Sequence, residues 1–140
     1  MLVGLPGSGK STYVERSGGT ALSSDELRRL LSDDATNQNI HHRVFSVLRN
    51  LLKHRLELRR PVTYIDATNL TRSERRPYIK LADVYDCDVE AVFFDVSVGE
   101  CQKRNRKRRR IVPAEVIAKM AKRLVTPSME EGFSRVTVVQ

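Results

Sequence analysis

The segment from Gly4 to Ser11, which reads GLPGSGKS, constrains the fold of this chain more than any other part of its sequence. It fits the pattern G-x-x-x-x-G-K-[ST], in which glycines let the backbone curl so that consecutive N–H groups point at phosphate oxygens. The apolar Met1-Leu2-Val3 precedes it, and residues 9–17 read as a helix whose positive dipole end faces the same phosphates. This strand–loop–helix setting predicts that the chain binds a nucleoside triphosphate.

The side chains of this loop have distinct expected roles. Lys10 can reach the β- and γ-phosphates, and the Ser11 hydroxyl can bind Mg²⁺. Turns rich in glycine and serine also occur in ordinary loops, but a match at every fixed position in this setting argues against that interpretation. The expected nucleotide-binding residues of the loop are Gly7, Ser8, Gly9, Lys10, Ser11 and Thr12.

Strands and helices alternate along the rest of the chain, without internal repeats. The expected strands cover residues 1–5, 20–22, 62–65, 89–96 and 136–139. The expected helices cover residues 9–17, 24–31, 37–59, 73–85, 98–108 and 114–124. Near-continuous apolar strands between helices predict a parallel sheet with helices on both faces. We therefore expect an α/β fold of the P-loop NTPase type, a three-layer sandwich in a single domain over residues 1–140.

Two of these helices have starts that depend on the capping residue. Ser24 is the expected N-cap of the helix after the second strand. Thr71-x-x-Glu74 resembles a capping box, but it leaves Pro77 inside the helix, where proline is costly. With Ser73 as N-cap, Pro77 falls in the first turn, so we expect the helix to begin at Ser73.

Positive charge is concentrated in one place. The formal net charge is +8, and the run from Lys103 to Arg110 carries seven positive charges and no negative one. Such a cluster attracts polyanions, either nucleic acid or a nucleoside triphosphate. If the run is helical, Arg104 and Arg108 share one face, and they can neutralise charge on a transferring phosphoryl group. We expect a basic helical lid over about residues 99–124, although runs of this kind also occur as solvated charged helices and as localisation signals.

Charged residues at other strand ends suggest an acceptor site. Asp25 follows the second strand and is the leading candidate for a general base, although it can also be a carboxylate that only offsets a helix dipole. Arg28 lies three residues on, on the same helix face, and suits an acceptor that carries a phosphate. Asp66 ends the third strand, where it can bind Mg²⁺ or orient Arg28, and Asp95 is a weaker candidate after the fourth. Ligands of such sheets bind beyond the carboxyl ends of the strands.

Together these pieces resemble the polynucleotide 5′-hydroxyl kinase family of P-loop phosphotransferases. The matching segments are GLPGSGKST, SSDELR, DATNLTRSERR and KRNRKRRRIVP, which span residues 4–113. The resemblance implies transfer of the γ-phosphate of ATP or another NTP to the 5′-hydroxyl end of DNA or RNA, in the repair or healing of nucleic acid ends. Many members form homo-oligomers, and many carry phosphatase or ligase modules for which this chain has no room.

The resemblance also implies roles for single residues. Asp25 would activate the 5′-hydroxyl, Arg28 would grip the phosphate next to the acceptor nucleoside, and Asp66 would orient Arg28. Arg104 and Arg108 would contact ATP from the lid, with Arg104 near the adenine. Arg109 and Arg110 make the lid more basic than the family pattern requires, so the resemblance assigns them no role.

Two other functions fit the same motifs. A small-molecule kinase of this fold uses the same phosphate loop, and a non-catalytic nucleic-acid binder can use the NTP as a switch. The sequence also argues against a membrane-spanning or secreted protein. No apolar run approaches the roughly 18 residues of a membrane span, and we expect no signal peptide before the loop. Cys87 and Cys101 are expected to be reduced, the three histidines to be ordinary helix residues, and the chain to be cytoplasmic.

Overall fold

Five parallel strands form the centre of the computed structural model, which describes all residues from 1 to 140. They are β1 (Leu2–Val3), β2 (Ala21–Ser23), β3 (Tyr64–Asp66), β4 (Glu90–Phe94) and β5 (Arg135–Val139). Every pairing is parallel, in the orders β1-β4-β5 and β2-β3. Two hydrogen bonds join the two parts: Gly4 N–H donates to the Thr68 carbonyl at 3.0 Å, and the Asn69 amide donates to the Leu2 carbonyl at 2.7 Å.

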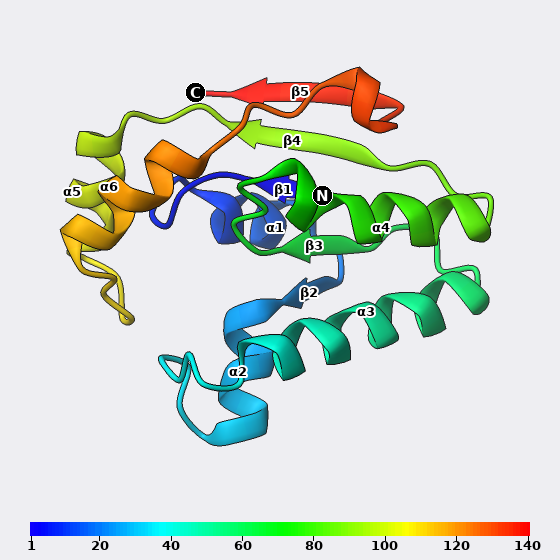
Figure 1. The fold of residues 1–140 in the computed structure, drawn as a ribbon, viewed down its shortest axis with the longest axis horizontal. Helices are drawn as coiled ribbons and strands as arrows, with labels where there is room; N and C mark the ends of the chain where they lie inside the picture. The colour runs from blue at the N-terminus through cyan, green and yellow to red at the C-terminus, as the bar shows by residue number, and fades with distance from the viewer.

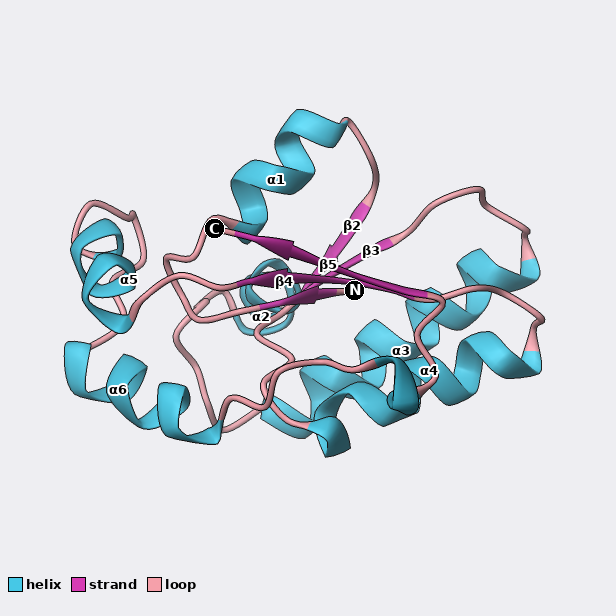
Figure 2. Cartoon of the chain, turned by 90° about the horizontal axis from the view of Figure 1, so that it is seen from above, coloured by secondary structure: helices cyan, strands magenta, loops and turns pink.

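Helices cover both faces of the sheet, but unequally. Figure 2 shows α1 (Lys10–Ser17) on one face and α3 (His41–Glu57) with α4 (Arg72–Val84) on the other. α2 (Ser24–Ser32) packs against α3. This arrangement confirms the predicted three-layer α/β sandwich.

The remaining helices lie away from these layers. α5 (Val98–Asn105) and α6 (Ala114–Arg123) lie beyond the end of the sheet toward which β4 and β5 point (Figure 1). A short 3₁₀ helix, η1 (Met129–Glu131), precedes β5. None of the helices combines the length and the apolar character that crossing a membrane requires.

The core is divided by the sheet because neighbouring residues of a strand point to opposite faces. Leu2 and Val3 are both fully buried, yet Leu2 packs in the cluster beneath α1 and Val3 in the larger cluster beneath α3 and α4. Val92 and Phe93 divide in the same way. A strand buried on both faces needs a continuous apolar run, which is why the sequence predicts a covered parallel sheet.

Both capping expectations are wrong. The Ser23 hydroxyl, not that of Ser24, accepts the Glu26 N–H at 3.3 Å, so the N-cap of α2 lies one residue earlier than expected. Thr71 caps α4 by accepting the Glu74 N–H at 3.2 Å, while the Glu74 carboxylate accepts the Leu70 N–H at 2.7 Å. Pro77 therefore lies inside α4, because satisfying two N–H groups at the helix start outweighs the hydrogen bond that proline cannot make.

Candidate active site

The phosphate loop joins β1 to α1 in the conformation that its glycines permit. Gly7 and Gly9 have φ values of 83° and 104°, in the left-handed region, and Gly9 is the N-cap of α1. A Cβ on Gly7 would lie 2.5 Å from the Cys101 carbonyl oxygen, so the loop can approach α5 only with glycine there. The Ser8 hydroxyl is buried without a hydrogen-bond partner, as expected in a cradle built for an anion.

Lys10 lies folded against the inside of this loop. Its Nζ donates to the Gly4 and Leu5 carbonyls, each at 2.9 Å. Burial lowers the pKa of Lys10 to about 8, although the nearby carboxylate of Asp66 favours the charged form. The ammonium group is therefore held at the loop, where a phosphate can exchange for the two carbonyls.

Ser11 and Asp66 form the second element of the donor side. The Ser11 hydroxyl donates to Asp66 Oδ2 at 3.1 Å, across the gap between α1 and the end of β3. Burial raises the pKa of Asp66, while Lys10 and Ser11 oppose that rise. Hydroxyl and carboxylate oxygens are the donors that Mg²⁺ prefers, so these two residues fit a magnesium ion that also binds NTP phosphates. No cluster of three or more His, Cys, Asp or Glu side chains offers an all-protein metal site.

Asp25 lies among three arginines. Its Oδ1 accepts hydrogen bonds from Arg28 Nη1, at 3.3 Å, and from Arg110 Nη1, and its Oδ2 lies 3.9 Å from Arg108 Nη2. Asp25 is partly exposed, whereas Arg28 is buried. Of the two roles left open for Asp66, the ion pair with Arg28 that the resemblance implies does not form. Arg28 pairs instead with Asp25 in the first turn of α2, and the Asp66 carboxylate accepts the Ser11 hydroxyl.

The basic run is not one helix, which corrects the expected lid helix over residues 98–108. α5 ends at Asn105, whose buried side chain donates to the Val112 carbonyl at 2.6 Å and accepts the Val112 N–H at 3.0 Å. These two bonds close the segment 106–111 into a loop. Arg104 and Arg108 consequently do not share a helix face: Arg104 pairs with Glu100 at 2.9 Å.

The basic side chains of residues 103–110 instead point in two directions, toward solvent and toward the cleft. Five of them are exposed, and two are partly buried toward the cleft. The exposed set is Lys103, Arg104, Arg106, Lys107 and Arg109. The inward pair is Arg108 and Arg110. Arg104, although exposed, still reaches the phosphate loop, since its Nη1 lies 4.0 Å from where a Cβ of Gly9 would be.

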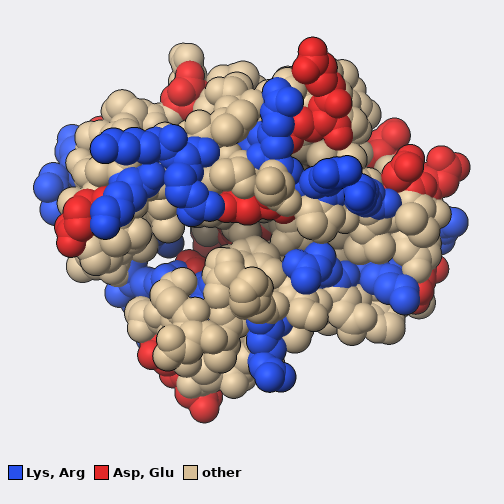
Figure 3. All heavy atoms as spheres, viewed as in Figure 1, with Lys and Arg blue, Asp and Glu red and all other residues tan.

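One cleft of about 1340 Å³ contains both the residues expected to bind the phosphate donor and those expected to bind the acceptor. In Figure 3 Lys and Arg side chains gather around the hollow that opens on this face. The weaker candidate Asp95 does not line the cleft. All the other residues expected in the site line it: Gly7, Ser8, Gly9, Lys10, Ser11, Thr12, Asp25, Arg28, Asp66, Arg104 and Arg108.

Sequence reasoning missed other residues of the cleft. His41 and Phe45 line it from the start of α3, with ring centroids 4.7 Å apart. Burial and the charge of Arg28 lower the pKa of His41. The i, i+4 spacing of these rings is a signal that could have found them, but it also suits an ordinary amphipathic helix. Arg110 was hidden by the uniform charge of its run.

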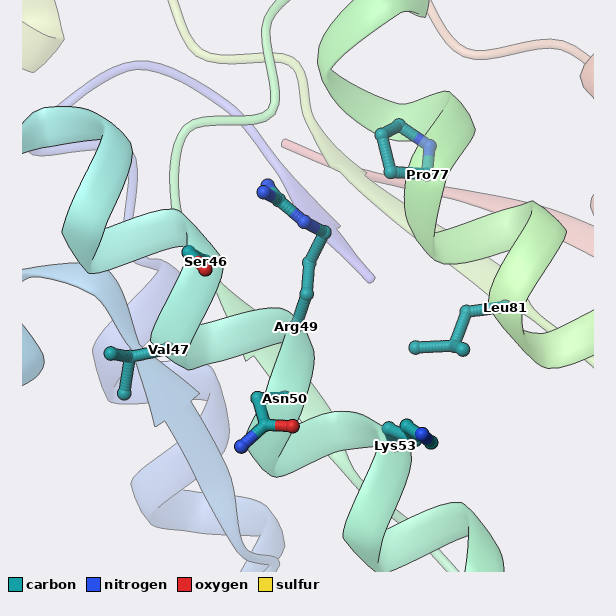
Figure 4. A pocket seen from close by; sticks show the side chains of 7 residues that line it. All are labelled: Ser46, Val47, Arg49, Asn50, Lys53, Pro77 and Leu81. Carbon is teal, nitrogen blue, oxygen red and sulfur yellow. The ribbon is translucent and has the colours of Figure 1, made fainter.

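A second, smaller groove lies between α3 and α4, away from the phosphate loop (Figure 4). It has a volume of about 490 Å³ and contains Arg49, Lys53 and Asn50 from α3 opposite Pro77 and Leu81 from α4. No carboxylate and no residue of the phosphate loop lines it, whereas both line the larger cleft.

Comparison with known proteins identifies the family. A family model described as AAA domain (AAA_33) matches residues 1–127. The chain belongs to this family. The match contains the phosphate loop, Asp25, Asp66 and the whole basic run.

One curated relative of this AAA_33 chain is the transcription factor bHLH140 of Arabidopsis thaliana. It is 30% identical over 147 residues, a match that covers 97% of this chain but 15% of that protein. The chain thus spans less than a sixth of the length of the curated relative that it matches.

Two solved structures share the fold. A gluconokinase from Sinorhizobium meliloti 1021 has a TM-score of 0.64 at 19% identity, covering 99% of this chain and 79% of that one. The APS kinase CysC of Mycobacterium tuberculosis, solved with AMPPNP and APS, has a TM-score of 0.55 at 19% identity, covering 98% and 85%. The AAA_33 chain therefore has a P-loop kinase-like fold. The polynucleotide specificity that the sequence suggested is not shown by either comparison.

Proposed function

We propose that this chain transfers the γ-phosphate of ATP, or of another NTP, to the 5′-hydroxyl end of a nucleic acid. One observation carries the proposal: the Asp25–arginine cluster lines the same cleft as the phosphate loop. The Asp25 carboxylate, in the first turn of α2, thus lines the same space of about 1340 Å³ as the loop after β1. A phosphotransferase needs this pairing of a donor cradle and a base beside the acceptor.

The chain's own groups then have defined tasks. Lys10 and the loop N–H groups bind the β- and γ-phosphates, while Ser11 and Asp66 would hold Mg²⁺, which neutralises phosphate charge when bound. Asp25 accepts the proton of the acceptor hydroxyl as its oxygen bonds to the γ-phosphorus. The bond from that phosphorus to the β,γ-bridging oxygen breaks, and the nucleoside diphosphate leaves with the electron pair. Arg108 stabilises the charge on the transferring group.

The surplus of positive charge favours a nucleic-acid acceptor over a neutral one. Two side-chain carboxylates line the cleft, those of Asp25 and Asp66. Basic side chains outnumber them by four, and they belong to Lys10, Arg16, Arg28, Arg104, Arg108 and Arg110. The exposed basic side chains of the run continue this positive surface outside the cleft. A polyanion can contact both, whereas a small alcohol reaches the cleft alone.

The direct test is transfer of labelled γ-phosphate to matched DNA and RNA oligonucleotides with 5′-hydroxyl ends. The Lys10→Ala variant is the control, because it lacks the ammonium group that binds the transferring phosphate. We expect label at the 5′ end with the wild type and little with the variant. Label that appears only on small alcohols would end the proposal.

Asp25 provides the sharper test of mechanism. In Asp25→Ala and Asp25→Asn the acceptor hydroxyl has no base, so we expect transfer to fall by about 10²- to 10⁴-fold. ATP binding should persist, because the phosphate loop is unchanged. Single-turnover rates and equilibrium ATP binding measure the two effects separately. Transfer at the wild-type rate in either variant would refute the assignment of Asp25 as the base.

Two other candidate functions make different predictions. A small-molecule kinase is favoured by the fold shared with the gluconokinase and the APS kinase, and it predicts label on a hydroxyl metabolite rather than on an oligonucleotide. A nucleic-acid binder that uses NTP as a switch predicts oligonucleotide binding without transfer, unchanged by loss of Asp25. One assay with oligonucleotides, a panel of small alcohols and a binding measurement separates all three.

A further inference from the structure

Arg110 lies in a defined position although no sequence pattern assigns it a role. Its side chain is 24% exposed, and its Nη1 donates to Asp25 Oδ1. The neighbouring Arg109 is exposed. The two hydrogen bonds between Asn105 and Val112 close the base of the loop and so fix the direction from which Arg110 enters the cleft.

Arg28 approaches the same carboxylate oxygen from α2. Its side chain is 5% exposed, and its Nη1 lies 3.3 Å from Asp25 Oδ1. Its Nε is buried with no hydrogen-bond partner. A buried guanidinium with an unsatisfied N–H is costly unless a ligand completes its bonding, and the planar guanidinium fork matches phosphate oxygens. Two guanidinium groups that share one carboxylate oxygen therefore mark a place prepared for a second anion.

The surroundings of this pair fit a nucleoside beside that anion. Phe45 and His41 line the cleft on the same side, and they provide ring faces on which a base can stack. Burial and the charge of Arg28 both lower the pKa of His41, which favours the neutral form of its ring. The pocket thus combines cations with ring faces.

We propose that Arg110 is a second ligand, with Arg28, for the acceptor phosphate next to the reacting sugar, and that binding this phosphate releases Asp25. The inference rests on the proposed function and deepens it by assigning the acceptor specificity to Arg110. When the acceptor phosphate binds, it accepts the hydrogen bonds that Arg28 and Arg110 otherwise donate to Asp25 Oδ1. That oxygen is then free to accept the hydroxyl proton, so the acceptor phosphate contributes to the rate as well as to binding.

The test compares two acceptors that differ only in the phosphate: a nucleoside 3′-phosphate and the same nucleoside. For wild type we expect the phosphate to raise kcat/KM strongly. In Arg110→Ala, kcat/KM for the nucleoside 3′-phosphate should fall by about 10- to 100-fold, as for loss of one charged hydrogen-bonding group, and the nucleoside should be affected much less. Arg110→Lys keeps the charge without the fork and should recover part of the loss. Arg29→Ala, which removes an exposed cation on the same helix as Arg28, is the matched control and should change neither acceptor.

Several outcomes would overturn the inference. An unchanged preference for the phosphate in Arg110→Ala would show that Arg110 does not bind it. Faster reaction of both acceptors would show that Arg110 only restrains Asp25. Calorimetric binding of the nucleoside 3′-phosphate to both proteins separates this inference from the proposed function. If binding depends on Arg110 but the wild type transfers no phosphate, the proposed function is refuted and the role of Arg110 as a phosphate ligand is supported. If the wild type transfers phosphate but binding does not depend on Arg110, the function is supported and this role of Arg110 is refuted.

Discussion

Lys10 is a buried ammonium group whose charge has to be present when phosphate arrives. Its Nζ donates to two carbonyl oxygens rather than to a carboxylate. These contacts offset only part of the effect of burial on the charged form, so the pKa of Lys10 falls to about 8. A phosphate prefers the charged form. Deprotonation of Lys10 therefore competes with nucleotide binding above that pH.

We expect ATP affinity to decrease as the pH rises through about 8. Each further unit should cost about tenfold, because the free protein must first take up a proton at Lys10. Calorimetric titration between about pH 7.5 and 9.5 measures the effect. Lys10→Arg stays charged over this range, so its affinity, whatever its level, should be flat with pH. A flat wild-type profile would contradict the assignment.

Single residues of the site differ in how well the sequence predicts them. Lys10 and Ser11 follow from a fixed spacing, and Asp25 and Asp66 from the rule that ligands bind at the carboxyl ends of parallel strands. Arg110 could not be predicted. In a run of seven cations no contrast in polarity separates an inward side chain from an outward one, and the loop that turns Arg110 inward is set by Asn105.

At the scale of elements, the α5 helix and its following loop present charge in two directions. Arg106, Lys107 and Arg109 face solvent, while Arg108 and Arg110 face the cleft. Under the proposed function, we expect the outward side chains to contact a long acceptor rather than a mononucleotide, because only a strand that leaves the cleft can reach them.

Replacing Arg106, Lys107 and Arg109 by Gln should weaken oligonucleotide binding and reduce its dependence on salt. The slope of log K against log[salt] is negative, and for single strands each lost phosphate contact reduces its magnitude by about 0.7. We therefore expect the magnitude to decrease by about 2. Fluorescence anisotropy at several salt concentrations gives this slope. The same loss of charge at Arg49, Lys53 and Lys80, on α3 and α4, should leave it unchanged. An equal decrease in both variants would indicate only a net-charge effect.

Boundaries of elements were predicted less well than their existence. The alternation of apolar strands and amphipathic helices is a signal over many residues, and it predicted the strands and the main helices. Starts and ends depend on single hydrogen bonds, as at Thr71 and Asn105. Hydrophobic periodicity does not contain that information, so Ser73 and a helix through Arg108 were both wrong.

At the scale of the whole molecule, a buried ion pair joins the segment before β5 to the start of α4. Arg75 is fully buried and donates to both carboxylate oxygens of Glu131, at 2.8 and 3.0 Å. Its Nη1 also donates to the carbonyls of Asn69, Leu70 and Val125. Burial opposes ionisation of Glu131, yet hydrogen bonds from Arg75 and the Ser128 N–H hold its pKa below the usual value.

Arg75→Met should lower the free energy of unfolding by about 3–5 kcal/mol, because Glu131 is left buried without its partner. Urea denaturation measures the loss. Arg135→Gln, which breaks the exposed pair with Glu90, is the control and should cost at most about 1 kcal/mol. Adding Glu131→Gln to Arg75→Met should restore part of the stability. A loss that is no greater than in the control would show that the ion pair of Arg75 with Glu131 does not stabilise the fold.

The ion pair between Arg75 and Glu131 is also a contact that the sequence does not predict. Arg75 and Glu131 are far apart in the chain, and an arginine between other charged residues reads as an exposed helix position. The layers follow from local patterns, but the order β2-β3 beside β1-β4-β5 and the contacts that join distant segments do not. The single domain expected over residues 1–140 stays a prediction.

The loop after α5 places two arginines at Asp25: Arg110 donates to Oδ1, and Arg108 lies 3.9 Å from Oδ2. Both are borne by one short segment that is closed at its base by Asn105. A donor that holds Arg108 therefore restricts where Arg110 can lie. Coupling free energy between two sites is reciprocal, so by whatever factor ATP tightens the acceptor, the acceptor tightens ATP. Under the proposed function, we therefore expect ATP and the acceptor to influence each other's binding through this loop.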